Sequence, residues 1–574
     1  MRAAAAPRAY AKATRLAKHI CRTEHIMSTP SNVSPPIAVE RGAVLDDAHL
    51  GDIRGAFGTI AHHDTAPRGT WRARLRTLLA IIGPGLIVMV GDNDAGAFGT
   101  YTQAGQNYGT TLLWTLLLLV PVLYVNQEMV LRLGAVTGVG HARLIFERFG
   151  KFWGAFSVID LFLLNALTIV TEFIGITFVL DFFGLPKVAG VCVAAALTMA
   201  AVSTGDFRRF ERFAVVLCVM SLLLVPVLVT IHPPVAQMSR DLFVPAWPAH
   251  AKLSDVMLLV IGVVGTTVAP WQLFFQQSYV IDKRITPRFM KYEKADLWIG
   301  IVFVLIGAVA MIGFSAALFG GHPEFGNFTD AGGVIAGLEK YAGRTSATLF
   351  AVALLDACII GAAAVSLSTA YAIGDVFKIR HSLHRNVSDA KGFYLVYFGI
   401  VAAAATLVLI PGSPLGLLTE AVQTLAGVLL PSATVFLLLL CNDRQVLGPW
   451  VNSTKLNIFT SAVIWVLVLL SIILTASVMY PDISGDAIVD VLVGGTVFAI
   501  AGYLATVLIR RNKRVIEPGV DRSLRDTWRM PPLDTLEPQV MTLSTRIWMG
   551  VLRGYLVIAV GLVIVKVVQM MLLR

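Results

Sequence analysis

The residues best able to do chemistry lie in an acidic interruption of the first hydrophobic segment. Residues 78–113 read LLAIIGPGLIVMVGDNDAGAFGTYTQAGQNYGTTLL, so the apolar run meets Asp92, Asn93 and Asp94 before it continues. A carboxylate at mid-bilayer is costly unless it has a function or a partner. The neighbouring glycines indicate unwound backbone, which a bilayer tolerates only where it lines a buried or water-filled cavity. The pattern predicts a broken helix that offers acidic oxygens to a cation, as in transporters.

A second interruption falls in the sixth hydrophobic segment. Residues 260–281 read VIGVVGTTVAPWQLFFQQSYVI. Pro270 lacks a backbone donor and clashes with a continuous helix, and on its own it would indicate only a kink. However, the first and sixth segments are both interrupted and run in opposite directions, as two inverted five-helix repeats require. The pair therefore predicts a binding site where the two repeats meet.

The composition is that of a helical membrane protein. The chain has 574 residues, of which 56% are hydrophobic and 14% charged, and its mean hydropathy is +0.73. These values exclude an ordinary soluble protein. The net charge of +10 comes from Lys and Arg in short loops, so we expect no nucleic-acid partner. Thirteen segments are long enough to span a bilayer: 77–105, 109–134, 153–183, 187–204, 211–231, 255–281, 296–319, 346–376, 391–411, 415–441, 457–480, 487–510 and 547–572.

Loop charges predict how the chain is oriented in the plasma (inner) membrane. Basic residues cluster before the first segment and after each even-numbered segment, whereas the loops 232–254 and 320–345 are poorer in them. By the positive-inside rule, the N-terminus is cytoplasmic. We expect a mostly disordered cytoplasmic tail, a transport core, additional transmembrane helices, a cytoplasmic linker and an appended transmembrane helix, at residues 1–76, 77–441, 442–510, 511–546 and 547–574.

Several short motifs resemble one family of transporters. GPG at 83–85 and QAG at 103–105 align without a gap with the start of the NRAMP divalent-metal transporters, and RLGAVTG at 132–138 resembles the end of their second span. The eighth segment, with GAAAVSLSTAYAIGD at 361–375, is also similar. The resemblance implies an all-α membrane protein with a LeuT-like 5+5 inverted repeat, broken first and sixth helices, and alternating access. Two or three C-terminal spans would be additional to that core.

The family's metal site is only partly retained at the matching positions. Where the family has Asp-Pro-Gly-Asn at the first break, this chain keeps the aspartate as Asp94 and has Ala97 in place of the asparagine. At the sixth break, the family's metal-binding alanine corresponds to Thr266, which could offer its carbonyl or its hydroxyl. The family's methionine and histidine correspond to Ala269 and Trp271.

Other polar residues complete the candidate set. Gln423 resembles a glutamine near the family's site, although a packing role in its helix is an equal alternative. Asp92 and Asn93 could line the pocket or cap a half-helix. Gln276 stands where the family has a further histidine, and with Trp271 and Gln272 it would shape the pocket. The candidate metal-site residues are Asp94, Thr266, Gln423, Asn93, Asp92, Ala97 and Ala269.

The lost residues predict which cation is carried. Methionine sulfur is soft and favours transition metals, so its absence leaves a site of oxygen donors. Such hard donors suit Mg²⁺, which keeps several waters because it dehydrates reluctantly. Alanine in place of asparagine and methionine also enlarges the cavity. The pattern GDNDAG resembles the divergent NRAMP-related magnesium transporters. We therefore favour Mg²⁺ as the substrate, with Mn²⁺ as a second one.

Coupling to protons is predicted to be weak or absent. Glu172 matches the glutamate of the family's proton path, but its acidic partner one turn earlier is replaced by Ile169. The histidines that titrate near neutral pH are lost as well. The alternatives are a proton-coupled Mn²⁺/Fe²⁺ importer of the NRAMP type and a LeuT-type symporter of organic solutes. We expect neither an enzyme nor a bound cofactor, because the sequence has no P-loop, HExxH or GxSxG motif.

Overall fold

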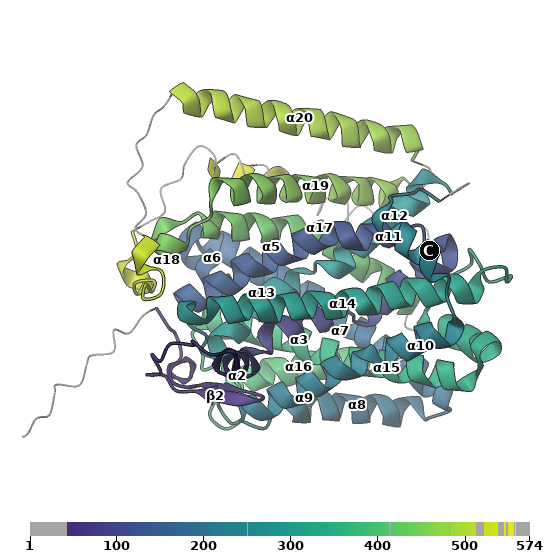
Figure 1. Ribbon diagram of the computed structural model, residues 1–574, viewed down its shortest axis with the longest axis horizontal. Helices are drawn as coiled ribbons and strands as arrows, with labels where there is room; N and C mark the ends of the chain where they lie inside the picture. The colour runs from purple at the N-terminus through teal and green to yellow at the C-terminus, as the bar shows by residue number, and fades with distance from the viewer. Residues whose placement is uncertain are drawn as a thin grey trace, which may run out of the picture. The chain divides into compact units, whose positions relative to one another are not determined.

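The computed structural model describes one compact unit within Gly42–Arg574. The described residues are 43–248, 251–411, 415–480, 483–512, 522–537, 545–546, 549–550, 552–555 and 557. The structure is a bundle of long helices that run side by side (Figure 1). The tail before residue 43 and most of the predicted last span, 547–572, lie outside the described residues.

Apolar helices dominate the described part of the chain. Among these residues, nine helices are long and apolar enough to cross a membrane, and two bent helix pairs could raise the number to eleven. The nine are Leu113–Thr137 (α5), Lys151–Phe183 (α7), Phe207–Ile231 (α9, η2 and α10), Leu253–Asp282 (α12 and α13), Pro287–Phe319 (η3 and α14), Ala331–Phe377 (α15), Lys391–Leu409 (α16), Thr454–Ser477 (in α19) and Gly485–Ala505 (in α20). The chain is thus a multi-pass membrane protein.

The first hydrophobic segment consists of separate helices. α2 (Trp71–Ile81) meets α3 (Pro84–Val90) at 52°, because Gly83 has a φ of 154° and Pro84 starts a new helix. α3 ends at the predicted acidic break, and α4 (Ala95–Tyr108) begins directly after Asp94. The predicted span 77–105 therefore comprises the end of α2, α3 and α4 rather than one continuous helix.

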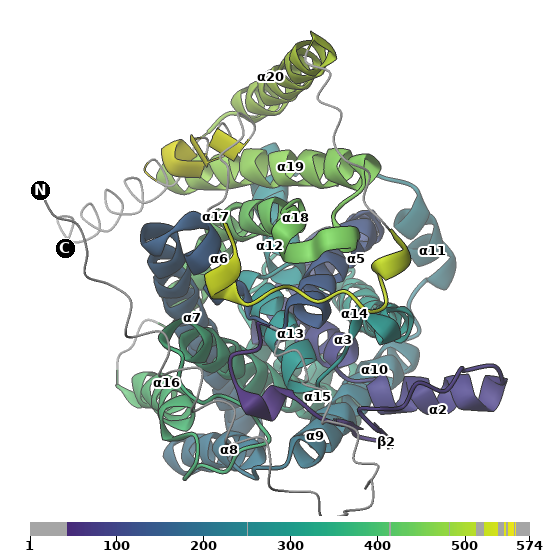
Figure 2. The same cartoon turned by 90° about the vertical axis from the view of Figure 1, so that its left-hand side faces the viewer.

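The sixth segment breaks at the predicted proline. α12 (Leu253–Thr267) ends before an extended Ala269, and α13 (Pro270–Asp282) begins at Pro270. α13 is buried along its whole length and packs against α5, α15, α3 and α17 (Leu415–Cys441). The end-on view of Figure 2 shows α13 in the middle of the bundle. Both broken helices are therefore held inside the protein, where unwound backbone is tolerated.

The remaining helices enclose these two. α14 (Met290–Phe319) lies against α3 and α4, and α15 lies against α7. α15 is longer than the predicted span 346–376 and is kinked at Gly343, where φ is 83°. The shorter helices are α6 (His141–Phe149), α8 (Lys187–Val202), α9 (Phe207–Met220), α10 (Leu224–Ile231), α11 (Val235–Phe243) and α18 (Arg444–Leu447); α19 runs to Met479 and α20 to Asn512.

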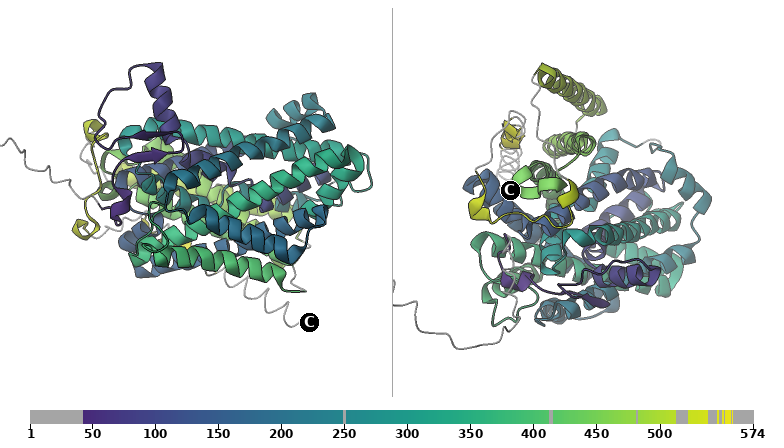
Figure 3. Two further views of the ribbon diagram at one scale, coloured as in Figure 1. Left: turned by 90° about the horizontal axis from the view of Figure 1, so that it is seen from below. Right: turned by 60° about the vertical axis from the view of Figure 1, so that its left-hand side comes forward.

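Part of the segment 1–76, predicted to be a mostly disordered tail, is folded in the residues that the structure describes. A 3-10 turn (Asp47–His49) is followed by a hairpin of β1 (Ile53–Gly55) and β2 (Gly58–Ile60), paired with Ile53 opposite Ile60. The hairpin lies at one end of the bundle, beside α2 (Figure 3). It is ordered because Ile53, Ala56 and Ile60 bury apolar side chains and because Glu211 of α9 accepts a hydrogen bond from the Ala56 amide at 2.5 Å.

Candidate functional site

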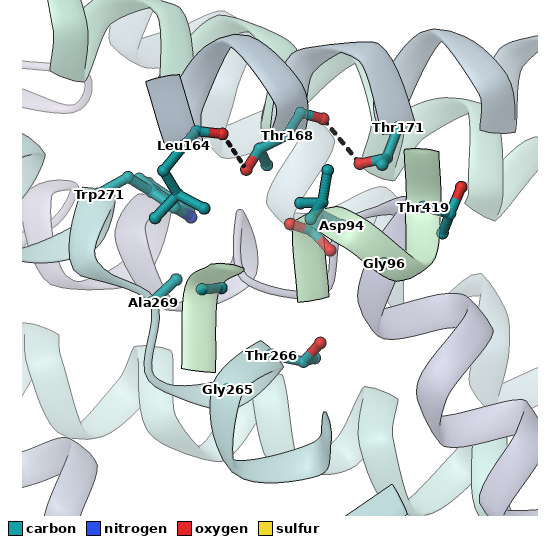
Figure 4. Close-up of a pocket in the computed structure, with 12 residues that line it drawn as sticks. Asp94, Gly96, Leu164, Thr168, Thr171, Gly265, Thr266, Ala269, Trp271 and Thr419 are labelled. Atoms are coloured by element: carbon teal, nitrogen blue, oxygen red, sulfur yellow. Dashed lines mark hydrogen bonds between the residues drawn. The ribbon is translucent and has the colours of Figure 1, made fainter. Parts of the chain in front are cut away.

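A cavity lies where the two broken helices meet α7 and α17. Its volume is about 40 Å³, measured as the space open to the centre of a water molecule. A single water needs roughly 10–15 Å³ of such space, so the cavity has room for an ion with a few waters. Figure 4 shows Asp94 and Thr266 on opposite sides of this space. The lining residues are Asp94, Gly96, Leu164, Thr168, Thr171, Gly265, Thr266, Ala269, Trp271, Thr419, Val422 and Ala426.

Asp94 is held in the cavity by its role as a helix cap. Its backbone is extended, and its Oδ1 accepts a hydrogen bond from the amide of Ala97 at 2.9 Å, which starts α4. Only one oxygen is needed for the cap, so the carboxylate still has lone pairs for a cation. Among the described lining residues, Asp94 is the only one with a charged side chain. Asp94 is therefore the lining residue of this cavity best suited to attract a cation.

Neutral oxygens surround this carboxylate. Thr266 is partly exposed in the last turn of α12, where the final carbonyl groups of a helix have no partner within the helix. That end of a helix carries partial negative charge and favours a cation. On α7, the hydroxyl groups of Thr168 and Thr171 donate to the backbone oxygens of Leu164 and Thr168, at 2.9 and 2.7 Å. Their oxygens remain able to accept a hydrogen bond from a hydrated ion.

The residues just before and after the start of α13 shape the cavity and offer it no ligating side chain. Ala269 is 8% exposed and lines the cavity with a methyl group, and Trp271 closes one side. The Trp271 backbone oxygen accepts from Ser368 of α15 at 3.0 Å, which fixes the start of α13. An indole nitrogen donates hydrogen bonds and cannot ligate a cation. In the described part of the chain, no group of three or more His, Cys, Asp and Glu could hold a metal ion, so this is not a closed cage of anionic ligands.

Asp92 and Asn93, two of the polar residues predicted at the first break, point away from the cavity. Asp92 is fully buried and accepts a hydrogen bond from Gln272 of α13, whose own Oε1 accepts from Gln127 of α5 at 3.0 Å. Asn93 donates to the backbone oxygen of Val304 on α14 at 3.3 Å. Neither side chain lines the cavity as described. Their contacts tie the broken backbone to α13 and α14, and Gln272 extends the network to α5.

The other predicted residues are placed as follows. Ala97 contributes the amide that Asp94 caps, and Gln276 is fully buried in α13 outside the cavity lining. Gln423 belongs to α17, one residue after Val422 of the lining, but its side chain lies outside the described residues. Glu172 of α7 is fully buried beside Asp94, and its Oε2 accepts from the Ala95 amide at 3.2 Å. The structure thus brings Asp94, Thr266, Ala269 and Trp271 together at one cavity.

Sequence reasoning missed the threonines of α7 and α17. Thr168 and Thr171 are three residues apart and share a helix face, as do Thr419, Val422 and Ala426 on α17. Threonine in an apolar helix usually bonds to its own backbone, so its presence carries little signal. The i, i+3 spacing of the two threonines, just before Glu172 in the third segment, was the available clue.

Comparisons with known proteins agree on one family. The model of the family "Nramp: Natural resistance-associated macrophage protein-like" matches residues 85–477. The "Divalent metal cation transporter MntH" of Latilactobacillus sakei is 26% identical over 431 residues, which cover 71% of this chain and 90% of that protein. The protein of the same name from Ralstonia nicotianae is 28% identical over 409 residues, which cover 68% and 88%.

A solved structure shares the fold. The manganese transporter of Eremococcus coleocola, in complex with an aromatic bis-isothiourea substituted compound, aligns with a TM-score of 0.60 at 20% identity, over 81% of this chain and 99% of that one. The predicted fold class, an all-α LeuT-like inverted repeat with broken first and sixth helices, is confirmed. From the family match over most of its transmembrane part, the chain belongs to the natural resistance-associated macrophage protein-like (Nramp) family.

Proposed function

We propose that this protein moves divalent metal cations into the cytoplasm by alternating access, with Mg²⁺ favoured and Mn²⁺ as a second substrate. The observation that carries the proposal is a single carboxylate, Asp94, in a cavity otherwise lined by neutral oxygen donors and apolar groups. Neither sulfur nor imidazole occurs among the described lining residues. Hard oxygen donors suit Mg²⁺ and also accept Mn²⁺.

The size of the cavity supports a partly hydrated ion. Mg²⁺ keeps several of its waters in protein sites because it dehydrates reluctantly. The space of about 40 Å³ accommodates such waters, and the threonines of α7 offer hydroxyl groups to them. Asp94 would act on the ion directly or through one water, and the carbonyl groups at the end of α12 would face it from the other repeat.

We also propose that the ion is driven mainly by the membrane potential. Ile169 is buried and apolar where an acidic residue would continue a proton path from Glu172, and Trp271 and Gln276 offer no titrating group near neutral pH. An inside-negative potential favours entry by about 2.3 kcal/mol per charge per 100 mV, and a divalent ion gains twice that. This proposal places the protein in the plasma (inner) membrane with its N-terminus in the cytoplasm.

One observation favours a second candidate, a proton-coupled importer of Mn²⁺ or Fe²⁺. Glu172 directly follows Thr171 and lies one helix turn after Thr168. It also contacts the first residue after Asp94, which places a second acid close to the cavity. The two similar MntH proteins are named divalent metal cation transporters, and the solved structure with the same fold is that of a manganese transporter. A symporter of organic solutes fits less well, because Asp94 occupies the helix N-terminus that would receive a carboxylate.

Uptake into proteoliposomes tests the proposal. Wild-type protein should take up Mg²⁺ under an inside-negative potential, and Asp94→Asn should abolish uptake while keeping the fold, since asparagine is an equally good helix cap. Thr168→Val, which retains volume, should reduce uptake without abolishing it. Equal Mg²⁺ uptake by wild type and Asp94→Asn would refute the assignment of the site.

A further inference from the structure

Two charged side chains hold the hinge between α2 and α3. Lys283, directly after α13, donates from Nζ to the backbone oxygens of Ile81 and Ile82, at 2.5 and 2.9 Å. Asp296 of α14 accepts from the amides of Gly83 and Gly85, at 3.1 and 2.6 Å. The end of α2 and the start of α3 are thus each satisfied by a buried ion. Because α3 leads to the break at Asp94, its position bears directly on access to the cavity.

α3 also makes a close backbone contact with α14. A Cβ on Gly85 would lie 2.6 Å from the Leu297 Cα, and a Cβ on Gly300 would lie 2.5 Å from the Gly85 backbone oxygen. Such contact leaves no space for water between the two helices. The contact therefore keeps water from passing between α3 and α14 as long as α3 stays in place.

Glu293 belongs to the buried charged cluster beside this hinge. It is fully buried in the first turn of α14, three residues before Asp296, and neither of its carboxyl oxygens has a hydrogen-bond partner among the described residues. An ionised carboxylate buried without a partner costs far more than the neutral acid. The arrangement seen here therefore requires Glu293 to carry a proton.

The surrounding charges reinforce this requirement. Asp296, Lys283 and Glu211 of α9 are charged groups that interact with Glu293. The ammonium group of Lys283 already forms an ion pair with Glu211 at 2.6 Å, and both side chains are fully buried. Asp296 supplies a further negative charge. Ionisation of Glu293 would place a third carboxylate beside a single lysine.

Other titratable groups on neighbouring elements offer no compensation. On α5, Glu128 pairs with Lys294 at 2.8 Å and with Arg132 at 3.3 Å. Arg288, in the turn before α14, donates to backbone oxygens of residues 64 and 66. Tyr279 of α13 and Cys218 of α9 lie near the cluster and are neutral between pH 6 and 8.

We propose that Glu293 is a proton-binding site whose occupancy is linked to the position of α3. While α3 is clamped on α14, the carboxyl holds its proton. When α3 leaves, water reaches the carboxyl, the O–H bond breaks, and the proton passes to that water. The clamped state binds one more proton, so higher pH favours the released state, by up to about tenfold in the equilibrium per pH unit. This coupling between the protonation of Glu293 and the position of α3 does not depend on which cation the cavity binds.

Hydrogen exchange of the α3 amides tests the link in the full-length protein. Wild-type protein in nanodiscs, without divalent cations, is compared at pH 6, 7 and 8 after correction for the intrinsic exchange rate. The α3 amides should lose protection as pH rises, by up to about tenfold per unit, while those of α19 stay constant. Glu293→Gln should remove this pH dependence, and Glu293→Met should do the same in a form that leaves no buried polar group. Glu172→Gln, the control, should keep it.

Two results would overturn the inference. One is a wild-type α3 whose corrected protection does not change with pH. The other is a folded Glu293→Gln or Glu293→Met protein that keeps the wild-type pH dependence, which would place the proton elsewhere. Because no transport is measured, either result leaves the proposed cation transport standing, and a failure of Mg²⁺ uptake leaves the hinge experiment unaffected.

Discussion

Glu172 on α7 meets the first turn of the half-helix that Asp94 caps: its Oε2 accepts from the Ala95 amide at 3.2 Å, and its Oε1 has no partner among the described residues. The fit is tight, since a Cβ on Gly361 of α15 would lie 2.9 Å from the Glu172 carboxyl. The two carboxyls of this region are therefore joined through one residue of backbone. Whether a proton is exchanged between Glu172 and Asp94 during transport separates the two candidate functions.

Glu172→Gln should leave Mg²⁺ uptake within about threefold of wild type, because glutamine keeps the acceptor for the Ala95 amide. It should also leave the pH dependence of uptake unchanged. Initial rates in proteoliposomes between pH 6 and 8 check both points, with Asp94→Asn as the inactive reference. Loss of uptake in a folded Glu172→Gln protein would favour the proton-coupled importer.

Ala269→Met should change the metal preference of the cavity. Ala269 is 8% exposed and lines the site, so a thioether there would face the ion. Soft sulfur favours Cd²⁺ and Mn²⁺ over Mg²⁺, and we expect the Cd²⁺/Mg²⁺ uptake ratio to rise by about tenfold or more. Ala269→Leu has a similar volume without sulfur and should lower the uptake of both ions alike. Equal ratios in the two variants would mean that position 269 does not face the ion.

Gly85→Ala should destabilise the protein and slow transport. The added Cβ would lie 2.6 Å from the Leu297 Cα, so α3 would have to move away from α14, at a cost of about 1–3 kcal/mol. Gly99→Ala in α4 is the matched control, because a Cβ there meets nothing within 4 Å and alanine favours the helix. Thermal unfolding in detergent compares the two. A Gly85→Ala protein as stable as Gly99→Ala would show that the contact is not tight.

The chain should lose stability in mild alkali through His381, which lies outside the membrane spans. Burial alone would lower the pKa of His381, but the charge of Asp375 and its hydrogen bond at 3.0 Å raise that pKa to about 9. The stabilisation from a raised pKa is fully present below the unfolded value of 6.5 and is lost as pH rises through about 9. The shift corresponds to about 3 kcal/mol.

Melting temperatures between pH 6 and 10 check this assignment. Relative to wild type, His381→Gln should be destabilised at pH 7 and nearly equal at pH 10. His62→Gln, at an exposed position, should follow the wild-type curve throughout. A constant difference between His381→Gln and wild type over the whole range would argue against a charged His381 in the folded protein.

Hydropathy and two interrupted segments were enough to predict the transmembrane core. The breaks at Asp94 and Pro270 could be located because acids, glycines and proline cannot continue an apolar helix. The folded hairpin before α2 could not be predicted, since its few apolar residues, such as Ile53 and Ile60, become informative only once α2 and α9 cover them. Nor could the sequence show that α2 and α3 are separate helices, because the positive φ of Gly83 that divides them is visible only in the structure.

The sequence pointed to the charged residue of the cavity, Asp94, but not to most of the residues that line it. Asp94 and Thr266 stand out because each occupies a break, whereas the threonines of α7 sit in an unbroken helix. For Asp92 the sequence left open a place in the pocket or at a helix cap. Its partner Gln272 lies far away in the sequence, and only the packing of α13 against α3 brings the two together. Tertiary contacts of this kind leave no pattern in a single sequence.

The most direct test of the account measures Mg²⁺ and Mn²⁺ uptake separately in proteoliposomes, with a pH dye inside and an imposed inside-negative potential. The account predicts Mg²⁺ entry that rises with the potential, causes no internal acidification and disappears in Asp94→Asn. Entry of Mn²⁺ alone, accompanied by protons, would contradict it and establish the proton-coupled importer instead.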